Sequence, residues 1–308
     1  MKKEDNSITF SDIIDFTLKD LNKFYPLEKQ ALVPLQNEPY IQNYLLVPAM
    51  ISQANKGVFT GILEDSSVKT SGIGFLSLEN GQILYFGQVI KKEGEILMDG
   101  QGKIINKKEK WKYSGHFKNG AITGYGIMKT GDKHNYDTYK GNLINRKRDG
   151  FGELITSSKK KYFGNWNNDR LVVGKIINED GVIYDGTFND DKLNGFGFII
   201  EDGNLVSHGN WRNGKLDATV GFKITNDYFY YGGWRNGKPN GKGIYLDLLY
   251  SIIMKGQWTS GSKDGKMAIL SDDKLCCEDW DNGSLLKRLY SVKIDDLMFA
   301  ARKEESKA

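Results

Sequence analysis

Hydrophobic and polar residues alternate with a period of two in short segments that recur along most of the chain. In each segment an aromatic residue, a glycine and a bulky apolar residue stand at alternate positions, as in Tyr113, Gly115 and Phe117. Successive side chains of a β-strand point to opposite faces, so these three residues share one face. The intervening residues, such as Ser114 and His116, are mostly polar. The pattern predicts strands with one aromatic face and one wet face.

The segment occurs ten times at a nearly constant spacing. Its central positions are residues 61, 87, 115, 141, 164, 186, 209, 232, 256 and 278, so the steps between them range from 22 to 28 residues. Turn pairs such as Asn119-Gly120 follow several segments, and Asn-Gly readily adopts the positive φ angles of a tight hairpin. A Gly-x-Gly sequence comes next, as in Gly241-Lys-Gly243. Each unit is therefore predicted to be a β-hairpin in a stacked array.

The repeats divide the chain into three predicted regions. Residues 57–284 are expected to form an all-β, elongated, single-layer solenoid of about nine to ten consecutive antiparallel hairpins. Residues 1–56 are expected to be a helical flank, with one helix between Ser11 and Pro26 and a second piece over about 40–54. Residues 285–308 are expected to be a tail with a short helix from Asp295 to about Glu305. These helices cap the open sheet edges or, alternatively, one of them occupies the groove until a partner displaces it.

Composition excludes several classes of protein. Gly supplies 36 of 308 residues without the every-third-residue period of collagen, and 16 Tyr, 15 Phe and 6 Trp are too many for disordered sequence. The 43 basic and 39 acidic side chains are too evenly balanced to indicate a nucleic-acid partner. The longest apolar run, Tyr44 to Ile51, is far shorter than a membrane span, and no apolar segment of a secretory signal follows the N-terminus. A soluble, cytoplasmic chain is expected.

No sequence motif predicts catalysis. Gly232 to Lys238 and Gly209 to Lys215 both match the phosphate-loop pattern Gly-x-x-x-x-Gly-Lys. Pro239 and Leu216 stand where Ser or Thr would bind magnesium, and both matches fall on predicted hairpin turns rather than on a strand-to-helix loop. The repeat consensus explains both matches, so the chain is expected to be non-enzymatic.

Histidine and cysteine give no metal site or cofactor site. His116 and His208 lie four units apart, too far to share a metal ion, and with His134 they are interpreted as surface residues. Cys276 takes the place of an aromatic residue and is expected to be a small core side chain, whereas Cys277 points outward. Two adjacent cysteines cannot form a disulfide framework, which favours a reducing compartment, although a strained vicinal disulfide with a redox role is the alternative.

The units resemble the MORN repeat (membrane occupation and recognition nexus), whose units of about 23 residues read Tyr-x-Gly-x-Trp-x-x-Gly-x-x-x-Gly-x-Gly. Residues 230–243 nearly reproduce this consensus, and the resemblance covers about 57–284, with atypical units at both ends. It implies a cytoskeletal, ciliary or membrane-contact scaffold, and dimerisation through terminal repeats in some cases. MORN arrays also accompany SET-type lysine methyltransferases and plant phosphatidylinositol phosphate kinases, but neither flank is long enough for such a domain.

The first functional hypothesis is a scaffold in a larger assembly, whose aromatic face forms a groove for a helix or extended peptide of a partner protein. The alternative for each ring is that it packs only within the core of the array. The residues expected to line the groove are Tyr113, Phe117, Tyr162, Trp166, Tyr184, Phe188, Trp211, Tyr230, Trp234 and Trp258.

The second hypothesis is peripheral binding to anionic phospholipid through basic turns. The turns between units carry two basic runs, and a third run, Arg146 to Arg148, falls on a turn within a unit, at the opposite edge of the ribbon. Because the charge is divided between two edges, a flat membrane would meet only part of it. The two runs between units consist of Lys107, Lys108, Lys110, Lys112, Lys159, Lys160 and Lys161.

Overall fold

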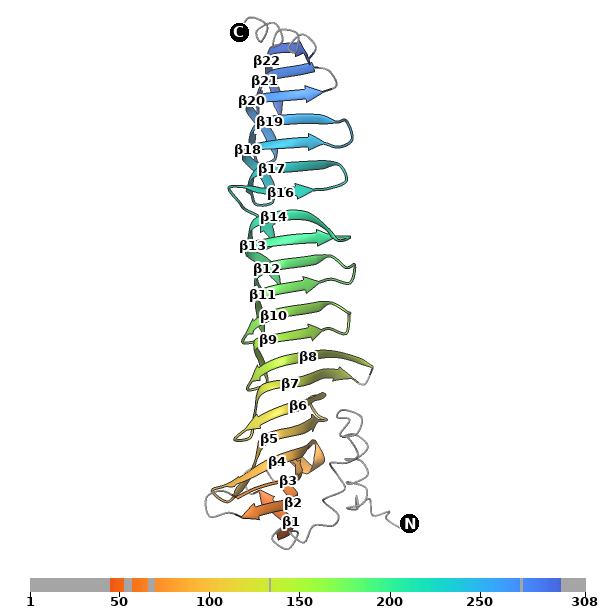
Figure 1. The fold of residues 1–308 in the computed structure, drawn as a ribbon, viewed down its shortest axis with the longest axis vertical. Coiled ribbons are helices and arrows are strands. Elements are labelled where there is room, and N and C mark those ends of the chain that lie inside the picture. Colours follow the sequence, from red (N-terminus) through yellow and green to blue (C-terminus); the bar gives the residue numbers. More distant parts are fainter. Residues whose placement is uncertain (1–44, 53–56, 66–69, 133, 272–273, 295–308) are drawn as a thin grey trace, which may run out of the picture.

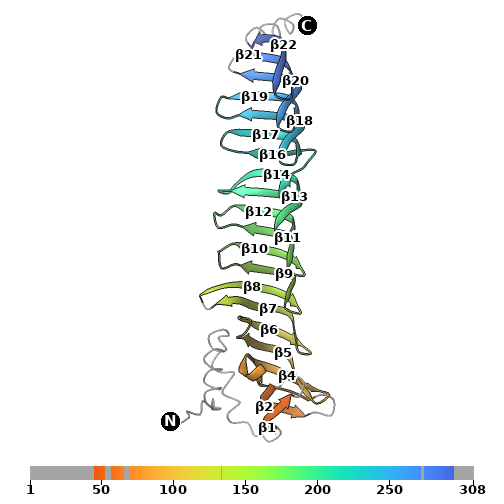
Figure 2. The same ribbon diagram turned by 180° about the vertical axis from the view of Figure 1, so that it is seen from behind.

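The computed structural model describes residues 45–52, 57–65, 70–132, 134–271 and 274–294. Its strands lie across the long axis of an elongated body, one above another (Figures 1 and 2). A single antiparallel sheet contains all 22 strands of these residues, and each strand pairs with its neighbours in the sequence, except that β15 and β16 both pair with β14 and not with each other. The predicted all-β array of consecutive hairpins is confirmed.

Most strands are 7 to 12 residues long. Strands β15 and β16 are short because they are two pieces of one returning strand, and β14 pairs with both. A single 3-10 turn, η3 (Glu79–Gly81), separates β3 from β4. In chain order the strands are β1 (Leu45–Ser52), β2 (Gly57–Asp65), β3 (Thr70–Leu78), β4 (Ile83–Lys92), β5 (Glu95–Asn106), β6 (Trp111–Lys118), β7 (Ala121–Asp132), β8 (Asn135–Ile144), β9 (Lys147–Ile155), β10 (Lys161–Asn167), β11 (Arg170–Ile177), β12 (Ile183–Asn189), β13 (Lys192–Glu201), β14 (Asn204–Arg212), β15 (Lys215–Leu216), β16 (Gly221–Ile224), β17 (Tyr228–Arg235), β18 (Lys238–Asp247), β19 (Ile252–Thr259), β20 (Ser262–Ser271), β21 (Lys274–Asp281) and β22 (Ser284–Lys293).

The sheet extends past both boundaries predicted from the repeats. Residues 45–52 form β1, so the second helical piece expected over about 40–54 is wrong there. Pro48 disfavours a helix interior, and in β1 it lies where the register with β2 shifts between Val47 and Met50, so no ladder hydrogen bond is required of it. At the other end β22 continues to Lys293. The helices expected between Ser11 and Pro26 and over about 295–305 lie outside the described residues.

The hairpin turns have the backbone geometry that their sequences predict. Asn213 and Gly214 have φ angles of 49° and 77°, and Asn236 and Gly237 have φ angles of 51° and 78°. Two successive positive φ angles give the turn a twist that matches the flanking strands. Both segments that resemble a phosphate loop end in these turns, so they are hairpins, as their repeat context predicts.

A continuous row of glycines, which we call the glycine spine, crosses the sheet from β2 to β19. Each glycine lies opposite a glycine of the next strand, as in the pairs Gly126–Gly141 and Gly141–Gly152. A Cβ atom added to Gly141 would lie 2.5 Å from the Cα atom of Gly152, so a larger residue does not fit. The spine consists of Gly61, Gly74, Gly87, Gly102, Gly115, Gly126, Gly141, Gly152, Gly164, Gly174, Gly186, Gly197, Gly209, Gly221, Gly232, Gly243 and Gly256.

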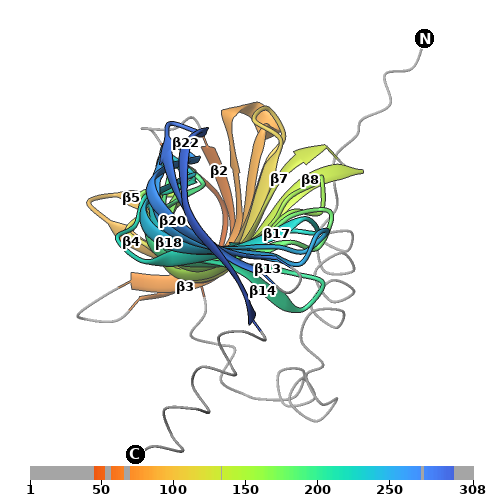
Figure 3. The same ribbon diagram turned by 90° about the horizontal axis from the view of Figure 1, so that it is seen from above.

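The sheet is folded lengthwise, so that its two long edges approach each other across the aromatic face. Arg146, in the turn after β8, lies 3.0 Å from Glu109, in the turn before β6, although the strands carry these turns at opposite edges. The Tyr162 hydroxyl, at the start of β10, likewise donates to the Asp191 carboxylate in the turn after β12, at 3.0 Å. Seen along the long axis, the strands are curved, and we call their concave side the trough (Figure 3). The aromatic face lines the trough, and the other face is the outer face.

Candidate functional site

The repeated tyrosines of the trough pack onto the glycine spine. The ring of Tyr139 lies against the positions where Gly141 and Gly152 would carry a Cβ atom, and its hydroxyl donates to the carbonyl oxygen of Asn142 at 2.9 Å. Tyr113 repeats the arrangement one unit earlier. Burial raises the pKa of each of these tyrosines to about 12. The spine thus provides the space in which the large rings are buried.

Most of the rings predicted to line the groove form the core of the array. Several of them contact one another edge to face, as Tyr230 and Trp234 do at a centroid distance of 5.0 Å. Tyr184 is the exception, because it is only half-buried. The accessible part of the trough therefore depends on where this packing opens, and contact with a partner stays a prediction. The nine buried residues are Tyr113, Phe117, Tyr162, Trp166, Phe188, Trp211, Tyr230, Trp234 and Trp258.

The packing opens between β10 and β15, where the trough has a hollow of about 590 Å³. Its apolar wall is formed by Ile176, Tyr184, Leu193 and Trp211, which come from four consecutive strands. Asn178 also lines the hollow, and its side-chain oxygen Oδ1 is buried without a hydrogen-bond partner among the described residues. An unpaired buried acceptor is rare in folded proteins, so this atom is suited to receive a donor from a ligand.

Two departures from the repeat account for the hollow. The side chain nearest to the added Cβ position of Gly197 is Leu193, whereas at Gly102, Gly126, Gly152 and Gly243 this space is filled by a tyrosine ring. In the next unit Ser207 stands in place of the tyrosine, and its hydroxyl donates to the main-chain oxygen of Phe222 at 3.0 Å. In another unit Tyr230 packs against Trp234, the tryptophan four residues later in the sequence. Trp211 lacks such a ring, because the residue four positions before it is Ser207.

Charged side chains of both signs surround the hollow. Lys160, Lys192 and Lys215 lie on its rim together with Asp180 and Asp191. They come from turns at both edges of the sheet, because the lengthwise fold brings these edges together here. A partner segment with both acidic and basic residues beside a large apolar side chain would match this rim.

The basic runs proposed for lipid binding are partly neutralised. Lys110 forms an ion pair with Asp132 at 2.7 Å. Arg148 pairs with Asp169 at 3.0 Å, and its guanidinium lies 4.4 Å from the centre of the Trp166 ring. The remaining lysines of the two runs between units are exposed or, for Lys160, half-buried.

As predicted, the turn with Arg146 to Arg148 lies at the opposite edge of the sheet from the other two basic runs. The predicted separation in space is wrong for Arg146. Arg146 crosses to the opposite edge, where it contacts Glu109 at 3.0 Å and lies 5.2 Å from the centre of the Trp111 ring. Trp111 donates to the same carboxylate at 2.8 Å. These two hydrogen bonds, that of Trp111 first, hold the pKa of Glu109 below its usual value. Arg146 and Glu109 thus form a clasp across the mouth of the trough.

The described residues contain no cluster of His, Cys, Asp or Glu arranged to hold a metal ion. Within them, no helix is long and apolar enough to cross a membrane. Cys276 and Cys277 are both free thiols, and the Cys276 thiol lies 3.4 Å from the Ser291 hydroxyl. His208 is half-buried on the outer face, where its ring stacks on Phe222 at a centroid distance of 5.5 Å.

The outer face carries aromatic residues that the sequence analysis did not identify. It was predicted to be wet, yet Tyr125, Phe151, Phe163, Phe196 and Tyr231 are large apolar side chains exposed on it. Each directly precedes a glycine of the spine, and the first, second and fourth are the middle residues of Gly-x-Gly sequences. An aromatic residue between two glycines was the available signal, because alternation places it opposite the buried tyrosines.

Stacked hairpins, a common spine and a shared aromatic core define a β-solenoid of repeated units, in which neighbouring units bury each other's apolar surface. The family model of the MORN repeat matches residues 113–134, 184–204 and 230–247. The chain therefore contains MORN repeats. MORN repeats generally mediate interaction with proteins or membranes, and the family is generally non-enzymatic. A search of curated proteins gives no match to the chain.

Proposed function

We propose that the protein is a non-catalytic cytoplasmic scaffold that holds a short segment of a partner protein in its trough, within a larger assembly such as a cytoskeletal or ciliary complex. The observation that carries this proposal is the hollow between β10 and β15. Half-buried Tyr184 presents ring surface there that the array does not cover, buried Trp211 forms part of the wall, and the Oδ1 atom of Asn178 lacks a donor among the described residues. Partly exposed aromatic residues in a preformed pocket are typical anchors of protein interfaces.

The size of the hollow limits the partner to a short segment. A volume of about 590 Å³ lies within the range of pockets that bind small ligands, and a folded domain would not enter it. The clasp of Arg146 and Glu109 closes the mouth of the trough towards the N-terminal side of the hollow. A helix or extended peptide that inserts one or two large side chains beside Tyr184 satisfies both limits.

Site-specific photo-crosslinking in the native cells tests this proposal. A photoreactive phenylalanine analogue replaces Tyr184 in the hollow or, as the matched control, Tyr125, which is 57% exposed on the outer face. We expect a crosslinked partner from position 184 that is absent from position 125. Equal crosslinking from both positions, or crosslinking from position 125 alone, would contradict binding in the trough. Circular dichroism of both variants verifies that the array is folded.

A second candidate function, binding to anionic lipid, is supported by the placement of the lysines between units. The turns before β6 and before β10 lie at the same edge, and Lys107, Lys108, Lys112, Lys159 and Lys161 are exposed on them or next to them. Flotation with phosphatidylinositol phosphate vesicles at low and high salt tests this function. Salt-sensitive binding that the K107E/K108E/K112E variant loses would support it, and absence of binding at low salt would exclude it.

A further inference from the structure

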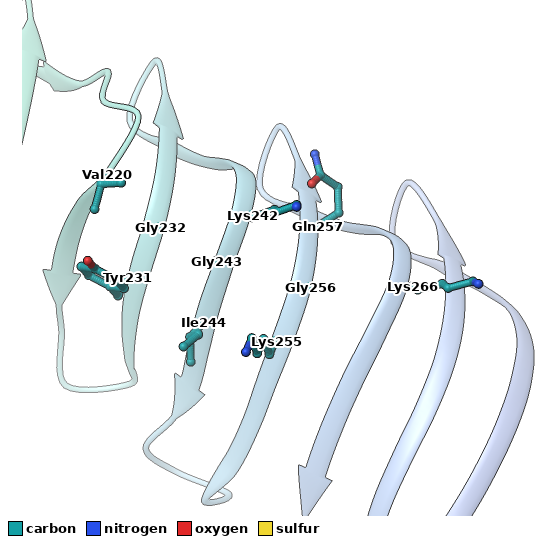
Figure 4. A pocket seen from close by; sticks show the side chains of 10 residues that line it. All are labelled: Val220, Tyr231, Gly232, Lys242, Gly243, Ile244, Lys255, Gly256, Gln257 and Lys266. Carbon is teal, nitrogen blue, oxygen red and sulfur yellow. The ribbon is translucent and has the colours of Figure 1, made fainter.

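The outer face has a second hollow, of about 500 Å³, over β16 to β20. Its floor is the backbone of the spine glycines Gly232, Gly243 and Gly256, and two rows of side chains form its walls (Figure 4). The spine residues alternate with the residues of the two rows, so any side chain at these positions would point into the trough and not into this hollow. This outer hollow lies on the opposite face of the sheet from the one proposed to hold a partner in the trough.

An apolar stripe leads along the outer face into this hollow. The stripe passes from strand to strand and becomes one wall of the hollow. Its members are successive register partners, namely His208, Phe222, Tyr231 and Ile244. Tyr231 is 47% exposed and Ile244 is 37% exposed, and Val220 beside them is 52% exposed. Contiguous exposed apolar surface of this kind, with a polar border, is typical of an interaction site.

Three lysines end the stripe. Lys255 follows Ile244 in the same wall, and Lys242 and Lys266 stand in the other wall (Figure 4). None of the three lysines forms an ion pair with a described residue. Asp279 is the register partner of Lys266 on the next strand, but the two side chains form no ion pair. The hollow thus has an apolar end and a positively charged end, and this charge lacks a neutralising partner within the described part of the chain.

We propose that this outer hollow binds an amphipathic helix of a partner protein whose apolar stripe ends in acidic residues. Neighbouring strands are about 4.8 Å apart, and one turn of an α-helix rises about 5.4 Å. A helix along the array therefore places residues three or four apart over successive strands. Its apolar residues meet Tyr231 and Ile244, and its carboxylates meet Lys242, Lys255 and Lys266. A flat bilayer does not reach the glycine floor between the two walls.

Selection of peptides on the full-length protein tests the proposal. A displayed library of random 16-residue peptides is selected on the immobilised chain, and the enriched peptides are synthesised and measured by fluorescence anisotropy. We expect peptides with apolar residues three or four apart followed by Asp or Glu. Their affinity should fall about tenfold in the K242E/K255E/K266E variant, because three exposed charge pairs, each weak by itself, are lost together.

Two control variants decide between this site and the other surfaces. K107E/K108E/K112E carries the same change of charge at the distant edge, and Tyr184→Ser alters the trough, so binding of the selected peptides should be unchanged in both. The proposal is wrong if the selection yields no acidic peptides, or if they bind K242E/K255E/K266E as tightly as the unmodified chain. It is also wrong if that variant loses binding to phosphatidylserine vesicles instead of peptides. Loss of binding in Tyr184→Ser alone would place the peptides in the trough.

Discussion

Alanine substitutions at two neighbouring spine residues, Gly152 and Gly141, are expected to cause different clashes. The new methyl group meets a side chain in the first case and mainly backbone in the second. For a Cβ atom added to Gly152, the three nearest atoms all belong to the Tyr139 side chain. For Gly141 two of the three nearest atoms belong to the backbone, the Cα atom of Gly152 at 2.5 Å and the carbonyl oxygen of Phe151 at 2.6 Å, and the third is the Tyr139 hydroxyl at 2.6 Å. A tyrosine can be replaced by a smaller residue, whereas paired backbone cannot move without breaking the ladder of hydrogen bonds.

We therefore expect Gly152→Ala and Gly141→Ala each to lower the free energy of unfolding, by about 1–3 kcal/mol, the usual effect of overpacking. Tyr139→Leu is destabilising by itself, because it leaves a cavity and removes the hydrogen bond to Asn142. In the double variant with Gly152→Ala, the smaller side chain provides room for the new methyl group, and we expect a favourable coupling energy of about 1–2 kcal/mol. With Gly141→Ala the coupling should be much smaller, because the backbone contacts remain.

The measurement is urea unfolding followed by tryptophan fluorescence, together with hydrogen exchange of the amides in β8 and β9. The local probe is needed because repeat arrays do not always unfold as one unit. Equal rescue of both alanine variants by Tyr139→Leu would refute the assignment of the two clashes. Unchanged stability of both single variants would show that the spine does not require glycine.

Three further predictions concern single side chains. Tyr139→Phe should destabilise the array by about 1 kcal/mol, whereas Tyr230→Phe should be neutral or slightly stabilising, because the buried Tyr230 hydroxyl has no partner in the described structure; thermal melts compare the two. Burial raises the pKa of both tyrosines to about 12, so the stability that they contribute is complete below pH 10 and is lost as the pH rises through 12; phenolate absorbance and circular dichroism should change together. Hydrogen bonds from Trp111 and Arg146 lower the pKa of Glu109, so in the unmodified chain the clasp should stay closed through the normal titration range of glutamate and open only at lower pH. The distance between spin labels on the two turns measures this opening. In the Arg146→Gln variant, which lacks the ion pair, the turns should already be separated at neutral pH.

Local patterns predict the hairpins well, because the signals that specify them act within a few residues. The φ angles of Asn213-Gly214 follow from the intrinsic preference of the pair, and alternation correctly places Tyr113 and Phe117 on one face. The failure at β1 has the same origin. A short apolar run around Pro48 fits either a helix or a strand, and pairing with β2 determines which of them forms.

The trough could not be predicted from the same patterns. Strand order places Arg146 and Glu109 at opposite edges, and the contact between them depends on how sharply every strand bends at the spine. The hollow at Tyr184 arises from departures from the repeat in two units, and their combined effect appears only when the neighbouring rings are packed. The outer stripe was not predicted because most residues that alternate with the tyrosines are polar, and the few aromatic ones come together only when the strands are stacked in register.

The direction of the strands determines how the molecule responds to mechanical force. Since every strand lies across the long axis, tension between the two ends acts along the hydrogen bonds that join one strand to the next. Such bonds break one ladder at a time, so we expect the array to peel apart stepwise at low force in an optical trap. An array built in this way is suited to act as a spacer of fixed length, and is poorly suited to serve as a tether under tension.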